Sequence, residues 1–371
     1  MVAVRAALYR GGTSKGLFLR AADLPSHLRA LVPTVSDARQ GRESPLDKFI
    51  AAAMGSDKYG MQLDGVGGGL SSTSKVAIVE ESVHAGHDVD YTFGQVDMKV
   101  GTIDWSGSCG NLASAVALFA LDEGLVKGGG KDASRVKVFQ TNLQYSINVS
   151  VPALDTPAEH HIPGVEAPGR PIAVDFVRPR VGSLPLLPTG KVCDTLLLPT
   201  SETFEASIVC AANPTIFVRA SDLGLESSPF PPPGSAQRLA PLIEAIRLQG
   251  SRMMGLPLTD AIRVSWLSAP TALKATDGAE MRPRDMAKIL KSTLYTAGTW
   301  KIHSGTHFFE NFCQDLAACI TTPGRLHHHA FTVLLTPDNG GRGERGLEAG
   351  CRLLFAADDQ GRGQSLFETE S

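Results

Sequence analysis

The chain has 371 residues, of which 43% are hydrophobic and 20% are charged, and its formal net charge is −3. This composition predicts a globular protein long enough for two domains, and the weak negative charge excludes a general attraction to nucleic acid or acidic membranes. No apolar run reaches the ~20 residues of a membrane span, and the N-terminus is too quickly polar for a secretory signal. We therefore expect a cytoplasmic protein with no nucleic-acid or membrane partner.

The cysteines and histidines are distributed in a way that argues against a metal centre. None of the six cysteines forms a CxxC pair, which disfavours a zinc ribbon. Three consecutive residues do not converge on one ion, so we interpret the run His327–His329 as part of a solvated loop. We expect reduced cysteines, no metal and no other cofactor.

Two strands near the N-terminus flank a short loop of glycine, serine and lysine. Residues 4–10 and 17–21 are the predicted strands, and Arg10–Gly16 between them reads RGGTSKG. Further along, Pro45–Met54 contains DKFIAAAM, whose apolar residues recur at helical spacing. We predict a helix over Pro45–Met54.

A glycine-rich stretch, Asp64–Val79, reads DGVGGGLSSTSKVAIV. Glycines let the backbone approach a ligand closely, and successive N–H groups in such a turn form a concavity that binds anions. Lys75 follows the hydroxylated residues and begins a β-branched run. We predict that this loop binds a carboxylate and that Lys75 performs proton chemistry on it. No helix follows the glycines, which argues against a nucleotide phosphate loop or a dinucleotide fingerprint.

The strongest helix signal is LASAVALFALDEG, which follows Gly110 and Asn111, and we expect Ser108 or Cys109 at its N-terminus. This run is apolar on nearly all sides, so we expect a buried helix. Its unpaired N-terminal N–H groups and macrodipole favour an anion or the thiolate of Cys109. Strands are predicted around it at Lys75–Glu80, Asp88–Val96, Lys99–Ile103, Val136–Gln140 and Tyr145–Val151.

Two short segments in the second half of the chain are similar in sequence to segments of the first half. Arg178–Lys191 is dense in proline and glycine and marks a predicted boundary between halves 1–180 and 181–371. Leu17–Leu24 matches Ile216–Leu223 at an offset of 199, and the start of the buried helix matches 310–312 at an offset of 200. We therefore predict duplicated halves with a ligand site between them. Further helices are predicted at Ala236–Gln249, with Ser235 as N-cap and Gly250 as its end, and at Pro283–Thr293.

The ordered motifs RGGTSKG, DGVGGGLSSTSKVAIV, CGN, LLPTGKVCDTL and SIVCAANPTIFVRASDLGL together resemble the PrpF family. The resemblance implies an α+β fold of two similar diaminopimelate-epimerase-like domains. Each domain is a β-barrel around a central α-helix, and the site lies in the cleft between them. It also implies a cofactor-independent isomerase that shifts a C=C bond by a 1,3-allylic proton transfer. The substrate class is an unsaturated di- or tricarboxylic acid such as aconitate or methylaconitate.

The same resemblance assigns roles to residues. The proposed family base matches Lys75, and the epimerase-type cysteine matches Cys109. Loop residues and their neighbours are expected to bind the substrate carboxylates: Thr13, Ser14, Lys15, Gly67, Gly68, Gly69, Ser72, Ser74, Gly110, Asn111 and Asn213.

The second half departs from the family's pattern in two places. Cys210 stands where members usually have Asp, and 303–311 differs from the usual HKAxAxTGA. These departures keep open a carboxylate-binding homologue with impaired catalysis. An amino-acid epimerase or racemase is another alternative, although Phe309 replaces the second cysteine that it needs. A thiol hydrolase using Cys109 with His303 is a third. A homodimer is also left open.

Overall fold

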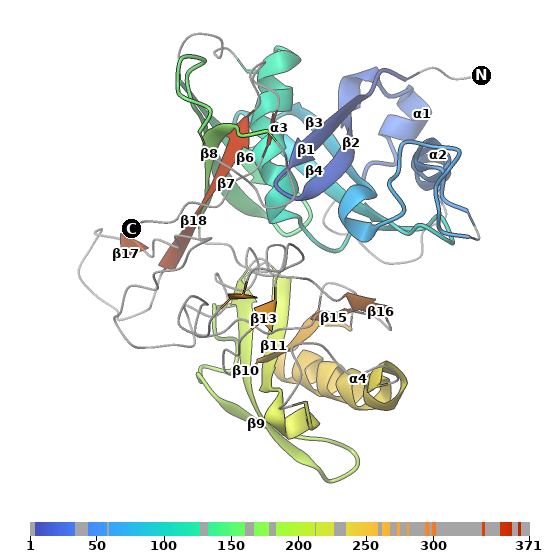
Figure 1. Cartoon of the computed structure of the whole chain (residues 1–371), viewed down its shortest axis with the longest axis vertical. Coiled ribbons are helices and arrows are strands. Elements are labelled where there is room, and N and C mark those ends of the chain that lie inside the picture. Colours follow the sequence, from blue (N-terminus) through green and yellow to red (C-terminus); the bar gives the residue numbers. More distant parts are fainter. Residues whose placement is uncertain are drawn as a thin grey trace. The chain divides into compact units, whose positions relative to one another are not determined.

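The computed structural model describes residues 4–33, 44–57, 59–126, 133–159, 167–177, 183–211, 213–225, 235–258 and 262–267, and short strands thereafter. The chain forms two compact units (Figure 1), Met1–Pro179 with Arg352–Phe367, and Arg180–Cys351 with Glu368–Ser371. The division at 179/180 lies next to the predicted boundary. The return of 352–367 to the first unit differs from the contiguous second half that we predicted.

A mixed sheet has the order β1-β2-β3-β4-β6-β7-β8-β18-β17, with β5 beside β4 and β19 beside β18, and its strands β1 to β8 belong to the first unit. The pairs β2–β3 and β4–β6 are parallel, whereas β1–β2, β3–β4, β6–β7 and β7–β8 are antiparallel. The strands are β1 Ala7–Gly11, β2 Ser14–Arg20, β3 Lys75–Glu81, β4 Val89–Val96, β5 Ile103–Asp104, β6 Ser134–Gln140, β7 Tyr145–Val151, β8 Arg170–Val177, β17 Thr336–Pro337, β18 Ala349–Ala357 and β19 Gly363–Gln364.

This sheet curls around α3, Gly110–Asp122. The helix lies against β1, β2, β3, β6, β7, β8 and β19, which include strands from both ends of the sheet (Figure 1). The rings of Tyr9 and Phe18 pack on Phe119 of the helix, with centroids 5.7 and 5.3 Å away. Residues 110–120 are all buried, so the predicted buried helix is confirmed.

The opposite face of the same strands packs on α2, Pro45–Met54. Ser44 and Asp47 form a reciprocal capping box at its start, Pro45 occupies the first turn, and the helix ends at Gly55, so the predicted helix is confirmed. Its buried side chains Leu46, Ile50 and Met54 pack in one core with alternate residues of two strands. These are Leu17 and Leu19 of β2, and Val76 and Ile78 of β3. A short helix, α1 Ser26–Arg29, precedes α2. Residues of β2 and β3 therefore alternate between the α2 side and the α3 side.

Two local predictions in this unit are wrong. The predicted strand Lys99–Ile103 is mostly a turn, because the Asp97 carboxylate accepts the N–H groups of Lys99 and Val100 at 2.7 and 2.8 Å. Ser14 and Lys15 were expected in a loop but belong to β2, where Lys15 pairs with Arg10. The turn of this hairpin is thus confined to Gly12 and Thr13.

The second unit contains a six-stranded sheet in the order β16-β15-β12-β11-β10-β9 and a separate pair, β13–β14. Its core places Leu239, Ile243 and Ile246 of α4 against Ile208, Ile216 and Val264 of the sheet. The elements are β9 Asp194–Leu197, β10 Thr203–Ala211, β11 Asn213–Arg219, α4 Ser235–Met254, β12 Arg263–Leu267, β13 Leu273–Lys274, β14 Glu280–Met281, β15 Leu294–Thr296 and β16 Thr299–Lys301.

Helix α4 is longer than predicted. Ser235 is its first residue rather than its N-cap, and the helix continues through Gly250 to Met254. A Cβ on Gly250 would lie 2.3 Å from Ile216 Cδ1, so this glycine allows the helix to pack closely on β11. Gly255, with φ +67°, follows the end of the helix.

The segments that echo each other in sequence have the same local structure. β1–β2 and β10–β11 are antiparallel hairpins, each followed by a short 3-10 helix, Ala21–Asp23 or Ser221–Leu223. After a helical segment, each hairpin gains a parallel partner, β3 or β12. The predicted helices at Pro283–Thr293 and around 310–320, and the run His327–His329, lie outside the described residues.

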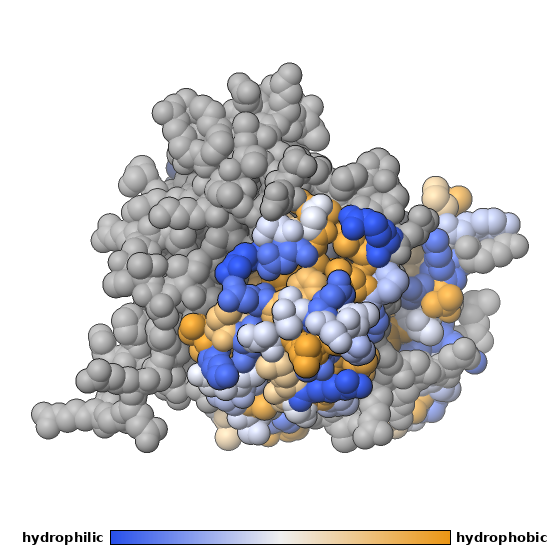
Figure 2. Space-filling view, turned by 90° about the horizontal axis from the view of Figure 1, so that it is seen from below, coloured by the Kyte–Doolittle hydropathy of each residue, from blue (hydrophilic) through white to orange (hydrophobic). Residues whose placement is uncertain are grey.

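Figure 2 shows hydrophilic and hydrophobic residues intermixed over the coloured part of one face. Among the described residues of the second unit, the large hydrophobic side chains that are exposed are Val192, Leu197 and Leu258. In the first unit several lie between Tyr59 and Leu70. Among the described residues, no helix combines the length and the apolarity that crossing a membrane requires.

Candidate active site

Lys75 is the first residue of β3 and lies directly opposite Gly16 on β2 and Gln95 on β4. This confirms its predicted position at the start of a strand. The residue is only 8% exposed. Its Nζ donates to Gln95 Oε1 at 2.6 Å and lies 5.6 Å from the centroid of the Phe93 ring. The ammonium group is therefore held in one place on the side of the sheet that faces α3.

Of the two residues expected at the start of α3, Ser108 and Cys109, it is Cys109 that forms the N-cap. Its Sγ accepts a hydrogen bond from the Leu112 N–H at 3.5 Å and donates to Ser14 Oγ at 3.6 Å. The positive end of the helix macrodipole is directed at this thiol. A negative charge on the sulfur, or on a substrate carboxylate beside it, is thus stabilised by the helix start.

Residues of the β1–β2 hairpin contact both Lys75 and the start of α3 at Cys109. A Cβ on Gly16 would lie 3.0 Å from both Leu112 Cδ2 and Lys75 O, so the start of α3 and the start of β3 meet at this glycine. Ser14, two residues earlier and 2% exposed, contacts the thiol. The structure therefore brings the first loop, the lysine and the helix start together, although they are far apart in sequence.

The other first-unit candidates fall into two groups. Gly110 and Asn111 are buried in the first turn of α3, and Thr13 and Lys15 lie beside Ser14 in the hairpin. Ser72 lies in a 3-10 turn, Ser71–Thr73, just before Lys75. These residues lie close in the chain to Ser14, Lys75 or Cys109. Ser74 differs, because its hydroxyl is buried and bonded to Gln62 Oε1 and Leu70 O at 2.6 and 2.8 Å.

The glycine-rich loop uses most of its N–H groups in hydrogen bonds within the protein. The N–H of Gly67 donates to Met54 O at 3.1 Å, and that of Gly69 donates to Gln62 Oε1 at 3.0 Å. Neither is available to a carboxylate in this conformation. Among the described residues, no hydrogen bond occupies the N–H of Gly68. The glycines therefore serve to fold the loop on itself, because a Cβ on Gly67 would lie 2.3 Å from the Gln62 side chain.

Gln62 organises this loop, and sequence reasoning missed it. Its Oε1 accepts from Gly69 N and Ser74 Oγ, and the residue is 2% exposed. Its φ of +53° is uncommon for a residue with a side chain, and such backbone strain clusters at functional sites. A single glutamine before a glycine run carries no sequence signal that would have identified it.

Asn142 is a second positioning residue that the sequence did not indicate. Its Oδ1 accepts from Phe93 N at 2.8 Å, and its Nδ2 donates to Phe93 O and Trp105 O at 2.9 and 2.7 Å. It therefore joins the end of β4, which carries Phe93 and Gln95, to the segment that leads into Cys109. One buried amide thus fixes the lysine's neighbours relative to the helix start.

Two tyrosines extend the site into the interior of the unit. Tyr145 Oη lies 2.9 Å from Ser108 Oγ, next to Cys109. The pKa of Tyr91 is raised well above its usual value by burial, with further contributions from Cys109 and Tyr145. Among the described residues, no group forms a hydrogen bond with the Tyr91 hydroxyl. This phenol therefore stays neutral near the thiol.

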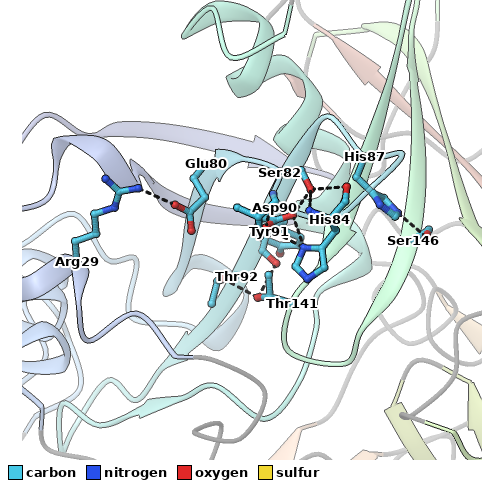
Figure 3. A network of polar contacts seen from close by, with 11 residues as sticks. Arg29, Glu80, Ser82, His84, His87, Asp90, Tyr91, Thr92, Thr141 and Ser146 are labelled. Atoms are coloured by element: carbon cyan, nitrogen blue, oxygen red, sulfur yellow. Dashed lines mark hydrogen bonds and ion pairs between the residues drawn. The ribbon is translucent and has the colours of Figure 1, made fainter.

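A separate polar network occupies the far end of the β3–β4 hairpin (Figure 3). His84 Nδ1 lies 3.0 Å from both carboxylate oxygens of Asp90, and Ser82 Oγ donates to Asp90 at 2.5 Å. The His84 ring stacks on Phe139 at 3.7 Å. Seven residues of extended strand place this cluster roughly 20 Å from Lys75, so it does not belong to the candidate site.

The remaining candidates lie elsewhere. Asn213 is the first residue of β11 in the second unit, where it is fully buried. Cys210, in the position where the family usually has Asp, is buried on β10. His303 lies outside the described residues, and within those residues no histidine is bonded to Cys109. No cluster of metal-binding side chains occurs in the part of the chain that was described.

Comparison with known proteins identifies the family of this chain. The family model described as PrpF protein matches residues 1–279. The chain is 32% identical to the 2-methyl-aconitate isomerase of Shewanella oneidensis, over 78% of this chain and 76% of that protein. It is 34% identical to the 3-methylitaconate isomerase of Eubacterium barkeri, over 68% and 63% respectively. The crystal structure of methylitaconate-delta-isomerase has a TM-score of 0.66 at 26% identity, covering 94% of this chain and 92% of that one. The chain therefore belongs to the PrpF family.

Proposed function

We propose that this protein is an isomerase of unsaturated di- or tricarboxylic acids that transfers a proton between two carbons without a cofactor. Aconitate and its methylated relatives are the substrate class, as the names of the related isomerases suggest. The observation that carries the proposal is the convergence of Lys75 and Cys109 on residues 14–16 of β2. A base and an acid at one end of a curled sheet suit a 1,3-proton shift.

In the proposed reaction, the neutral amine of Lys75 removes a proton from the carbon next to the double bond. The electron pair moves through the C=C bond into the adjacent carboxylate and forms a dienolate. The N–H groups at the start of α3 stabilise the charge on that carboxylate. The Cys109 thiol then gives its proton to the carbon two positions away, which completes the shift. A proton passing from the ammonium to the thiolate restores both residues.

We also propose that the second half completes the substrate site, as in the two-domain arrangement implied by the family resemblance. The support is the repeated order of hairpin, 3-10 helix, helical segment and parallel strand in both units. In this arrangement Asn213 would contact the substrate. A crystal structure with a bound tricarboxylate would test it, and Asn213 lying away from the ligand would contradict it.

Solvent-proton exchange tests the proposed function directly. The protein is incubated in D₂O with a panel of unsaturated di- and tricarboxylates, and deuterium incorporation and product formation are followed by NMR. The wild type is expected to isomerise at least one acid. Lys75→Ala should lower the exchange rate by about 10³-fold or more, because removal of a general base costs about 10²–10⁴-fold.

Lys137→Ala is the matched control, because Lys137 is an exposed lysine on β6 of the same sheet. It should keep the wild-type exchange rate. A Lys75→Ala protein that exchanges protons as fast as this control would remove Lys75 from the mechanism. A wild type that exchanges with none of the acids would contradict the proposed function itself.

A further inference from the structure

The hydroxyl of Ser14 is buried against the thiol of Cys109. Ser14 is the first residue of β2, it is only 2% exposed, and its Oγ lies 3.6 Å from Cys109 Sγ. Within the described part of the chain, this sulfur is the only hydrogen-bond partner of that hydroxyl. The family resemblance placed Ser14 among the residues expected to bind the substrate carboxylates. In this structure its hydroxyl is directed at the thiol.

Two glycines beside Ser14 let the hairpin approach the first turn of α3 closely. Gly11 pairs with Ser14 across the β1–β2 ladder, and a Cβ on Gly11 would lie 2.4 Å from Asn111 O. Gly16 lies two residues after Ser14 on the same face of β2, and its Cβ would lie 3.0 Å from Leu112 Cδ2. Neither position has room for a side chain. The hairpin is therefore seated on the helix start, which keeps the Ser14 hydroxyl beside the sulfur.

The two hydrogen-bond partners of the Cys109 sulfur differ in what they can do. The N–H of Leu112, 3.5 Å away, can only donate. The Ser14 hydroxyl can accept or donate, because its proton rotates about the Cβ–Oγ bond. It accepts the S–H proton of the neutral thiol, and it can donate to the thiolate once that proton has left. The sulfur therefore keeps both hydrogen bonds in either protonation state.

We propose that Ser14 is the positioning residue of Cys109, which orients the S–H proton in the resting enzyme and donates to the thiolate during the reaction. When the thiol gives its proton to the substrate carbon, a C–H bond forms, the S–H bond breaks and the sulfur keeps the electron pair. Rotation of the Ser14 hydroxyl then supplies a second donor to the negative sulfur. When the ammonium of Lys75 returns a proton to the sulfur, the hydroxyl turns back. This inference rests on the proposed function of Cys109.

This role competes with carboxylate binding, because a hydroxyl has only one proton to donate. If Ser14 donates to the thiolate, it does not donate to a substrate carboxylate in the same step. A serine that binds the substrate contributes to KM, whereas a serine that acts through Cys109 contributes to the step in which the thiol gives up its proton. The two assignments therefore predict different kinetics for the same substitution.

Ser14→Ala separates the two assignments. Its kcat and kcat/KM for isomerisation should fall together by about 10–100-fold, the effect of losing one hydrogen bond to a charged group, while KM stays near the wild-type value. Deuterium incorporation into the remaining substrate in D₂O should stay near the wild-type rate. The reason is that Lys75 still removes a proton from the first carbon and returns a deuteron to it.

Ser251→Ala is the matched control. Ser251 is also a serine that is 2% exposed, and its hydroxyl donates to Leu256 O at 2.7 Å in the second unit. This variant should leave kcat and KM unchanged. A raised KM with unchanged kcat in Ser14→Ala would overturn the proposal and assign Ser14 to substrate binding. Wild-type kinetics in Ser14→Ala would overturn it as well.

The S–H stretching band tests the contact between Ser14 and Cys109 without any substrate. The Raman spectrum of the wild type minus that of Cys109→Ala gives the band of this thiol. It should lie at the lowered frequency of a thiol that donates a hydrogen bond, and it should move to higher frequency in Ser14→Ala. A wild-type band at the frequency of a free thiol would overturn the proposal, and so would a band that Ser14→Ala leaves unmoved. Absence of proton exchange in the wild type contradicts only the isomerase activity, since this band does not depend on turnover.

Discussion

The two ends of the β3–β4 hairpin hold a cationic or ionisable side chain in different ways. At one end, His84 lies against the carboxylate of Asp90, which also accepts from Ser82 (Figure 3). At the other end, Lys75 lies against the carboxamide of Gln95. In both networks the acceptor is a residue of β4, Asp90 or Gln95, and Asp90 is the more deeply buried of the two.

The difference separates the end that fixes a turn from the end at which we propose the chemistry. A carboxylate that accepts hydrogen bonds from three donors fixes the loop at Ser82–His84. A neutral amide fixes the position of Lys75 without stabilising its ammonium by a full charge. Replacing the carboxylate of Asp90 by an amide should therefore lower stability, whereas replacing the amide of Gln95 by a carboxylate should lower the proposed activity.

The largest effect on stability is expected at the turn. Asp90→Ala removes the acceptor of the Ser82 hydroxyl and of His84 Nδ1 in a place where Asp90 is only 5% exposed. Hydrogen bonds to a charged acceptor contribute about 1.5–3 kcal/mol. Urea unfolding at neutral pH should show a loss of that size, while kcat/KM stays near the wild-type value.

Asp88→Ala gives a control on the same loop, because Asp88 is exposed and, among the described contacts, its carboxylate accepts only the N–H of Lys137 on β6. It should cost less stability than Asp90→Ala. A loss of kcat/KM in Asp90→Ala beyond the loss of folded protein would mean that the two ends are not independent.

The next effect concerns Tyr91, which lies between the two ends on β4. Its pKa is raised in the folded protein, so above about pH 10 the unfolded chain loses a phenol proton that the folded chain retains. Stability is thus fully present below pH 10 and falls by about 1.4 kcal/mol per pH unit above it. Tyr91→Phe should reduce this fall.

Urea unfolding of both proteins at pH 8, 10 and 11 measures the difference. Near pH 8 the variant should be at least as stable as the wild type, since it removes a buried hydroxyl that has no partner among the described residues. If the free energy of unfolding fell equally with pH in the wild type and in Tyr91→Phe, then Tyr91 would ionise equally in the folded and the unfolded state, which would contradict the prediction.

The smallest effect is expected at the ion pair of Arg29 and Glu80, close to the turn. The two side chains are 52% and 36% exposed and their atoms are 3.1 Å apart. Exposed pairs of this kind contribute less than about 1 kcal/mol. Arg29→Ala should therefore shift the urea midpoint slightly, and less so in 0.5 M salt. A loss as large as that of Asp90→Ala would contradict the contrast between the buried and the exposed pair.

The sequence predicted well those features that depend on neighbouring residues. The capped helix Pro45–Met54, the buried helix after Cys109 and the position of Lys75 at a strand start all follow from local patterns, and all are confirmed. Two local predictions were wrong. The Asp97 carboxylate binds backbone N–H groups and makes a turn where a strand was predicted. The helix α4 continues through Gly250, where it was predicted to end, because this glycine packs closely on β11.

The tertiary structure alone decided which distant residues meet. Gln62, Gln95 and Asn142 carry no motif, because an amide acquires its role only when its acceptor and donors arrive from other segments. The same holds for the loop glycines, whose N–H groups turn inward. By itself the sequence determined most of the helices and strand starts, since these depend on residues a few positions apart, and it singled out Lys75 and Cys109 as candidates. The placing of Lys75 and Cys109 around β2 required the curled sheet to close over α3, which no local pattern encodes.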